Sequence, residues 1–164
     1  MKSPVIRAAI LVAIALALVL VLAVLVPAYM SRRPGPRQDP CLPNLHALSV
    51  AMQMYVQDSG RFPGAASWME GLRPYLTRKD PFHCPGDKEH LYSYAMNSAL
   101  SGVKPPDPKN LPHVILFFSS DSGKRNASGS PAANCRPHEG EGNMCAVVYA
   151  DGDAEMLGPG QRPE

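Results

Sequence analysis

The residues of this chain best placed to do chemistry are its four cysteines. Cys41, Cys84, Cys135 and Cys145 all lie beyond residue 40, and no other cysteine is present. An even count of cysteines in one small domain indicates disulfide bonds formed in an oxidising compartment. Four cysteines allow three connectivities, and composition alone leaves all three open.

The spacing of the cysteines favours one of these connectivities. Cys135 and Cys145 are ten residues apart and flank a turn-rich segment, so a local bridge closes easily. Cys41 and Cys84 would then tie the first helix of the domain to a loop in its middle. In the chain-entropy model a loop of that length is worth roughly 4 kcal/mol. We therefore expect the disulfides Cys41–Cys84 and Cys135–Cys145.

A metal-binding site is the alternative chemistry that these and other polar residues allow. Asp121, Asp151 and Asp153, together with loop carbonyls, are ligands of the kind that calcium takes, and His138 is a further candidate ligand. Asp is also common in turns, which is where Asp151 and Asp153 are expected. No Cys-x2-Cys or His-x3-His spacing supports zinc. The sequence thus predicts no resident cofactor, with calcium as the alternative.

Catalytic and nucleic-acid-binding signatures are missing from the sequence. It holds no Gly-x-Ser-x-Gly, no phosphate loop and no His-Glu-x-x-His. The net charge is +2, and acids and bases are interspersed without a basic stripe. We expect neither an enzyme nor a nucleic-acid-binding protein, and we interpret His138 as a residue that orders its loop.

A helical pattern in the first half of the domain must position Cys41. Leu45, Leu48 and Met52 recur at the spacing of one helix face, after Asn44 as N-cap and before a stop near Gln57. A second, short helix is predicted from 67 to 76, with Ser67 and Glu70 forming a capping box.

Strand patterns occupy the second half. Short strands are predicted at 91–96 and 114–119, and the second is apolar from Val114 to Phe118, as in a central strand. The segment 120–142 reads as a long loop, which is a candidate specialised region. Asp151-Gly152 between two strand-like runs predicts a hairpin over 145–157 with a type I′ turn.

The N-terminus carries one uninterrupted apolar run, Ala8 to Val26. As a helix it would span roughly 28 Å, close to the ~30 Å of bilayer hydrocarbon. Lys2 and Arg7 precede it, as they would in a cleaved signal peptide, but the run is longer than a usual signal core and no Ala-x-Ala site follows. These features favour a retained transmembrane signal-anchor. The cysteine count, and not the basic residues on either side of the run, indicates a cytoplasmic start and an exported domain.

The predicted fold class is α+β: an N-terminal transmembrane helix, then a loop-rich domain with one main helix on a small antiparallel sheet. The expected divisions are a cytoplasmic start and signal-anchor (1–30), a Pro-rich tether (31–43), an exported domain (44–158) and a tail (159–164).

The order of these features resembles the type IV pilin-like proteins. The nearest likeness is the pseudopilin-like, prepilin-type processing-associated group, named for a His-x9-Asp-Gly motif. The segments that carry the resemblance, in order, are Pro27 with Cys41-Leu42-Pro43-Asn44-Leu45, Ala51 to Tyr55, Asp58 to Pro63, Leu72 to Leu76, Phe82 to Asp87, Ser93 to Asn97, Leu116 to Asp121, His138, and Tyr149-Ala150-Asp151-Gly152.

The chain departs from that family at the family's processing signal. The family's glycine, phenylalanine and glutamate around the cleavage point fall on Val5, Ile6 and Ile10 here. Twelve residues rather than nine separate His138 from Asp151. The resemblance therefore implies a divergent member without a prepilin cleavage motif.

The resemblance also implies a function and a location. It implies a membrane-anchored structural protein that contacts other pilin-like or secretion-system subunits, as in type II secretion or pilus systems. The expected location is the bacterial inner membrane, spanned once, with the domain periplasmic or extracellular. The alternative is a stand-alone anchored periplasmic domain that binds calcium or a small ligand.

Overall fold

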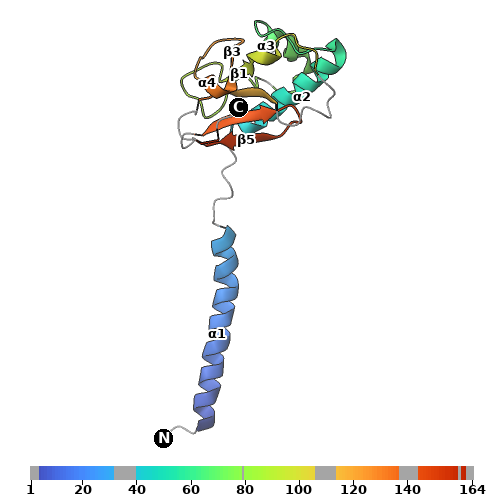
Figure 1. Ribbon diagram of the computed structural model, residues 1–164. Helices are drawn as coiled ribbons and strands as arrows, with labels where there is room; N and C mark the ends of the chain where they lie inside the picture. Colours follow the sequence, from blue (N-terminus) through green and yellow to red (C-terminus); the bar gives the residue numbers. More distant parts are fainter. Residues whose placement is uncertain are drawn as a thin grey trace. The chain divides into compact units, whose positions relative to one another are not determined.

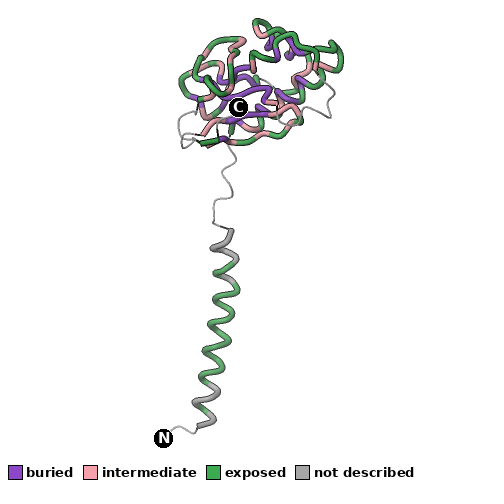
Figure 2. The backbone as a smooth tube through the Cα atoms, in the orientation of Figure 1, coloured by how far each residue is buried: buried purple, intermediate pink, exposed green. Residues whose placement is uncertain are grey.

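The protein divides into two compact units, residues 1–38 and 39–164, each considered by itself. The computed structural model describes residues 4–31, 40–78, 80–105, 114–136, 144–158 and 160–161. Residues 32–39 of the predicted tether (31–43), His138 and most of the predicted tail lie outside these ranges. Figure 1 shows the elements of both units, and Figure 2 shows their burial.

The first unit is the helix α1 (Pro4–Ser31). It runs past Pro27, where the apolar sequence ends. Every α1 side chain whose exposure is described is exposed; Leu11 and Leu20, for example, are each 67% exposed.

The predicted transmembrane helix is wrong. In the described ranges no helix has both the length and the apolar character needed to cross a membrane. This finding overturns both the transmembrane signal-anchor of the expected fold and the single-pass inner-membrane location.

The second unit is an α+β domain whose main helix is α2 (Leu42–Ser59). Leu45, Leu48 and Met52 are buried as the spacing predicts. The N-cap, however, is Cys41, because Pro43 is accepted in the first helical turn, where its missing N–H costs nothing. Gly60 ends the helix at a φ of 70°, and its N–H donates to the carbonyl of Val56.

The sheet is mixed, not antiparallel as expected. Its strands are β1 (Tyr94–Asn97), β2 (Ile115–Ser119), β3 (Ser128–Gly129), β4 (Cys145–Tyr149) and β5 (Ala154–Leu157), in the order β3-β1-β2-β4-β5. The pairs β1–β2, β2–β4 and β4–β5 are antiparallel, whereas β3 pairs parallel with β1.

The central strand β2 is buried at all five positions. A register shift against β4 between Ile115 and Phe117 marks a β-bulge. Side chains on a regular strand alternate between faces, but Leu116 and Phe117 both join the core under α2. Ile115 and Phe118 join a second core on the opposite face.

Each face of the sheet has its own cover. The first core contains residues of α2 and of α3 (Trp68–Leu72), which is followed by the 3-10 turn η1 (Arg73–Tyr75). A further 3-10 turn, η2 (Ser98–Leu100), follows β1. The second core is covered in part by Ala127 and Cys135, on either side of α4 (Pro131–Asn134). The long loop predicted at 120–142 thus contains β3 and α4.

Two local predictions are corrected by tertiary contacts. Ser67 makes no capping hydrogen bond; Asn126 Oδ1 accepts from the N–H of Met69 in the first turn of α3, and the Glu70 carboxylate pairs with Arg125 and accepts from Asn126. The β4–β5 hairpin is present, but the turn is not type I′, since Asp151 does not have positive φ. Gly152 has a φ of 96°, and its N–H donates to the Tyr149 carbonyl at 3.1 Å, as after a type I turn.

The β4–β5 hairpin also predicts a pH dependence. Burial and a 2.6 Å hydrogen bond to Glu155 raise the pKa of Tyr149 from 10.0 to about 12. The unfolded chain then releases this proton before the folded chain does, so the stabilisation is complete below pH 10 and is lost as the pH rises toward 12. We expect denaturation midpoints to fall across this window, and to fall less for Tyr149→Phe. Tyr92→Phe controls for loss of a tyrosine elsewhere, and an equal effect of both variants would contradict the assignment.

Candidate functional site

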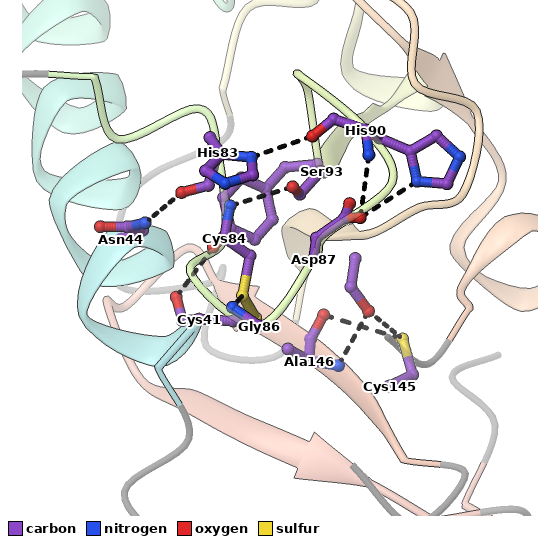
Figure 3. The surroundings of a disulfide bond; sticks show 12 residues. Cys41, Asn44, His83, Cys84, Gly86, Asp87, His90, Ser93, Cys145 and Ala146 are labelled. Atoms are coloured by element: carbon purple, nitrogen blue, oxygen red, sulfur yellow. Dashed lines mark hydrogen bonds and ion pairs between the residues drawn. A yellow bond between two sulfur atoms is a disulfide. The ribbon is translucent and has the colours of Figure 1, made fainter. Parts of the chain in front are cut away.

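The Cys41–Cys84 disulfide is the centre of the candidate site. It joins the N-cap of α2 to the loop 81–93, across a sequence separation of 43 and a Cα–Cα distance of 5.0 Å. Both cysteines are 0% exposed. This is one of the two pairs that the spacing favours, and it places the start of α2 on the loop (Figure 3).

Hydrogen bonds hold the loop beside this disulfide. Asn44, which was expected to cap α2, lies within the helix and donates from Nδ2 to the carbonyl of His83 at 2.7 Å. The N–H of Cys84 donates to Ser93 Oγ at 2.9 Å, and the N–H of Ser93 donates to the carbonyl of Phe82. The loop is therefore closed on itself as well as bonded to α2.

A buried carboxylate organises the far side of the loop. Asp87 is 5% exposed, and its Oδ1 accepts from the backbone N–H groups of Glu89 and His90 at 3.1 Å each. His90 Nδ1 lies 3.2 Å from the same oxygen, and His83 Nδ1 lies 2.9 Å from the carbonyl of His90. A carbonyl only accepts, so His83 carries its proton on Nδ1 in this contact. The histidines of the loop thus order the chain around Cys84.

The second disulfide, Cys135–Cys145, lies on the other side of the sheet. It links the residue after α4 to the start of β4, with a Cα–Cα distance of 5.9 Å, and both cysteines are half-buried. Ser119 supports it from β2: its hydroxyl donates to the carbonyl of Arg136 at 2.6 Å and accepts from the N–H of Ala146 at 3.1 Å. This disulfide therefore fastens the cover of the second core.

The candidate calcium ligands are not brought together. Asp121 is exposed, with its Oδ2 3.9 Å from Arg136 Nε. Asp151 and Asp153 lie at the β4–β5 turn, where Asp151 Oδ1 accepts from the N–H of Asp153. Across the described residues no group of three or more His, Cys, Asp or Glu could hold a metal ion. His138 lies outside the described residues, and calcium binding stays a prediction.

Asn126 is a structural residue that the sequence pattern did not reveal. Its φ is 54°, a left-handed conformation that Asn tolerates better than most residues. Oδ1 accepts from the N–H of Met69 at 2.8 Å and Nδ2 donates to Glu70 at 2.8 Å. The hydrogen bond from Asn126, a backbone hydrogen bond and the Arg125 ion pair lower the pKa of Glu70. The Asn126 side chain thus joins the segment before β3 to α3.

The surface of the domain has a largely apolar hollow between α2 and the β4–β5 turn. Its volume is about 580 Å³, and its floor is formed by the core residues Met52, Phe62 and Leu116. Gln53 lies at its edge and donates to the carbonyl of Ala150 at 3.1 Å. The expected alternative of small-ligand binding stays a prediction.

Comparison with protein-family models, curated proteins and solved structures gives no match to this chain.

Removal of the long-range disulfide should cost more stability than removal of the local one. For loops of 43 and 10 residues, chain entropy predicts losses of about 4 and about 3 kcal/mol. We expect the double variant Cys41→Ala/Cys84→Ala to lose more free energy of unfolding in urea than its matched control, Cys135→Ala/Cys145→Ala. The reverse order would show that loop closure is not the main contribution of these disulfides to stability.

The two disulfides should also differ in reactivity. Exchange needs a thiolate to reach a disulfide sulfur, and only Cys135 and Cys145 are partly exposed. Under mild reductant without denaturant, we expect alkylation of Cys135 and Cys145 well before Cys41 and Cys84, as mapped by peptide mass. Equal labelling rates would mean that the domain opens as a whole before either bond reacts, and a urea series would reveal this.

Proposed function

We propose that this chain is a pilin-like, pseudopilin-like structural subunit that works by protein–protein contact in a secretion or pilus-type assembly. The observation that carries the proposal is α1. Its described stretch 10–23 consists only of Ile, Leu, Val and Ala, and these side chains are exposed around the whole helix.

A helix with no polar face needs neighbours on every side. The apolar stripe through which a surface helix contacts one partner is roughly 100° wide, so a single partner helix leaves most of α1 uncovered. Three or more neighbours are needed to surround it. This requirement favours a multi-subunit assembly over a simple dimer.

The layout of the second unit is consistent with the same proposal. The segments that resemble the pilin-like group fall on structural elements: Cys41 to Leu45 begins α2, Ser93 to Asn97 contains β1, and Tyr149 to Gly152 forms the β4–β5 turn. A domain with two disulfides suits a subunit that must stay folded outside a reducing compartment.

The test is self-association of the full-length protein in a mild non-ionic detergent. We expect oligomers by light scattering and by crosslinking. Leu16→Gln/Leu20→Gln places two amides on one face of α1 and should shift the population toward monomer. The matched control is Leu91→Gln, an exposed leucine of the second unit that should leave the oligomers unchanged.

Two results would overturn this proposal. One is a full-length protein that stays monomeric at all concentrations and crosslinks to no other protein in cells. The other is an equal loss of oligomers in the Leu91→Gln control, which would place the contact outside α1.

A further inference from the structure

A second hollow on the domain differs in chemistry from the one beside α2. It has a volume of about 430 Å³ and lies where η1 and the residues after it meet the start of the loop 81–93. That volume is within the ~300–1,000 Å³ range of small-molecule sites. Its apolar walls come from Leu76, Pro81, Phe82 and Tyr92.

The floor of this hollow is a fixed aromatic ring. Phe82 is 3% exposed, and its ring meets that of Trp68 edge-on at a centroid distance of 5.8 Å. The Arg73 guanidinium lies over the same ring, with its Cζ 5.9 Å from the centroid. Stacking of this kind orients a guanidinium while leaving its N–H donors available. A charged donor is thus held at an apolar floor.

The charge of the hollow is positive. Arg73 and Arg78 line it, against the single carboxylate of Asp80. Among the described residues neither arginine forms an ion pair, whereas Arg125 and Arg136 are paired with Glu70 and Asp121. Two guanidiniums beside one carboxylate favour an anionic ligand.

The backbone around the hollow is constrained before any ligand arrives. Asp80 has a φ of 55°, Pro81 has a fixed φ, and Cys84 is disulfide-bonded two residues after Phe82. A site that is already ordered loses little entropy on binding.

We propose that this hollow binds a carboxylate carried on an apolar or aromatic body. The carboxylate would accept hydrogen bonds from Arg73 and Arg78, and the apolar body would lie against Phe82 and Tyr92. Two sources share this chemistry: a small organic acid, and the free C-terminus of a polypeptide that ends in a hydrophobic residue. The site is separate from α1 and does not depend on self-association.

The test uses full-length protein in non-ionic detergent with 3-phenylpropionate as probe. Calorimetry gives the affinity, and the Trp68 indole N–H, which donates to the carbonyl of Ala127 at 3.0 Å, gives an NMR signal next to the floor. We expect saturable binding and a shift of this signal. The neutral amide of the probe should bind about tenfold more weakly, because it lacks the charge that the guanidiniums recognise.

Matched arginine variants locate the site. Arg73→Met and Arg78→Met should each weaken binding about tenfold, whereas Arg61→Met, an exposed arginine elsewhere, should not. A peptide with a free C-terminal Phe and its amidated form then separate the sources. Tighter binding of the free peptide than of the small acid assigns a polypeptide C-terminus, and the reverse assigns a small acid.

Three results would overturn the proposal. The first is no binding of 3-phenylpropionate or of the free peptide up to about 10 mM. The second is equal binding of the acid and its amide. The third is a loss of affinity in Arg61→Met equal to that in Arg73→Met and Arg78→Met. The second result would mean that the hollow binds only through apolar contact. The third would mean that binding depends on the overall surface charge and not on these two arginines.

Discussion

The double-sided burial of β2 is the constraint on which the rest of the domain depends. A strand buried at every position must have its two faces covered at once, and the bulge at Leu116 directs two consecutive side chains to the same side. The chain meets this demand with two covers of different kinds. One is a regular helix, α2, and the other is the irregular segment around α4. Each cover is fastened by its own disulfide, and Trp68 and Asn126 link the two by hydrogen bonds to Ala127 and Met69.

The parts of this arrangement that follow from local chemistry could be predicted from the sequence. The apolar stripe of α2, the central strand, the existence of the β4–β5 hairpin and the favoured cysteine pairs depend on periodicity, turn residues and loop length. Each acts over a few residues or through a covalent bond. Their positions were therefore close to those in the structure.

The parts that depend on distant partners could not be predicted. Asn44 is a good N-cap by type, but α2 begins two residues earlier, at Leu42, and Asn44 donates from Nδ2 to the carbonyl of His83 instead. Glu70 fits a capping box, but Arg125 and Asn126 bind it first. The parallel pairing of β3 rests on two residues in a Ser- and Gly-rich segment that carries no strand pattern. The hollow at Arg73 and Arg78 combines residues from both sides of a turn, which no spacing rule connects. The transmembrane helix expected from the run Ala8 to Val26 is not found among the described helices.

The two edges of the sheet bear on the association through α1 that we propose. Crowding raises the chance that exposed strand edges join and propagate as fibrils. One edge, β3, is only two residues long, and the other, β5, carries the exposed Glu155 in a strand of four residues. Neither offers a long, flat, uncharged template. The sheet edges therefore favour neither fibril growth nor edge-to-edge pairing, which is what a subunit held at high local concentration would need.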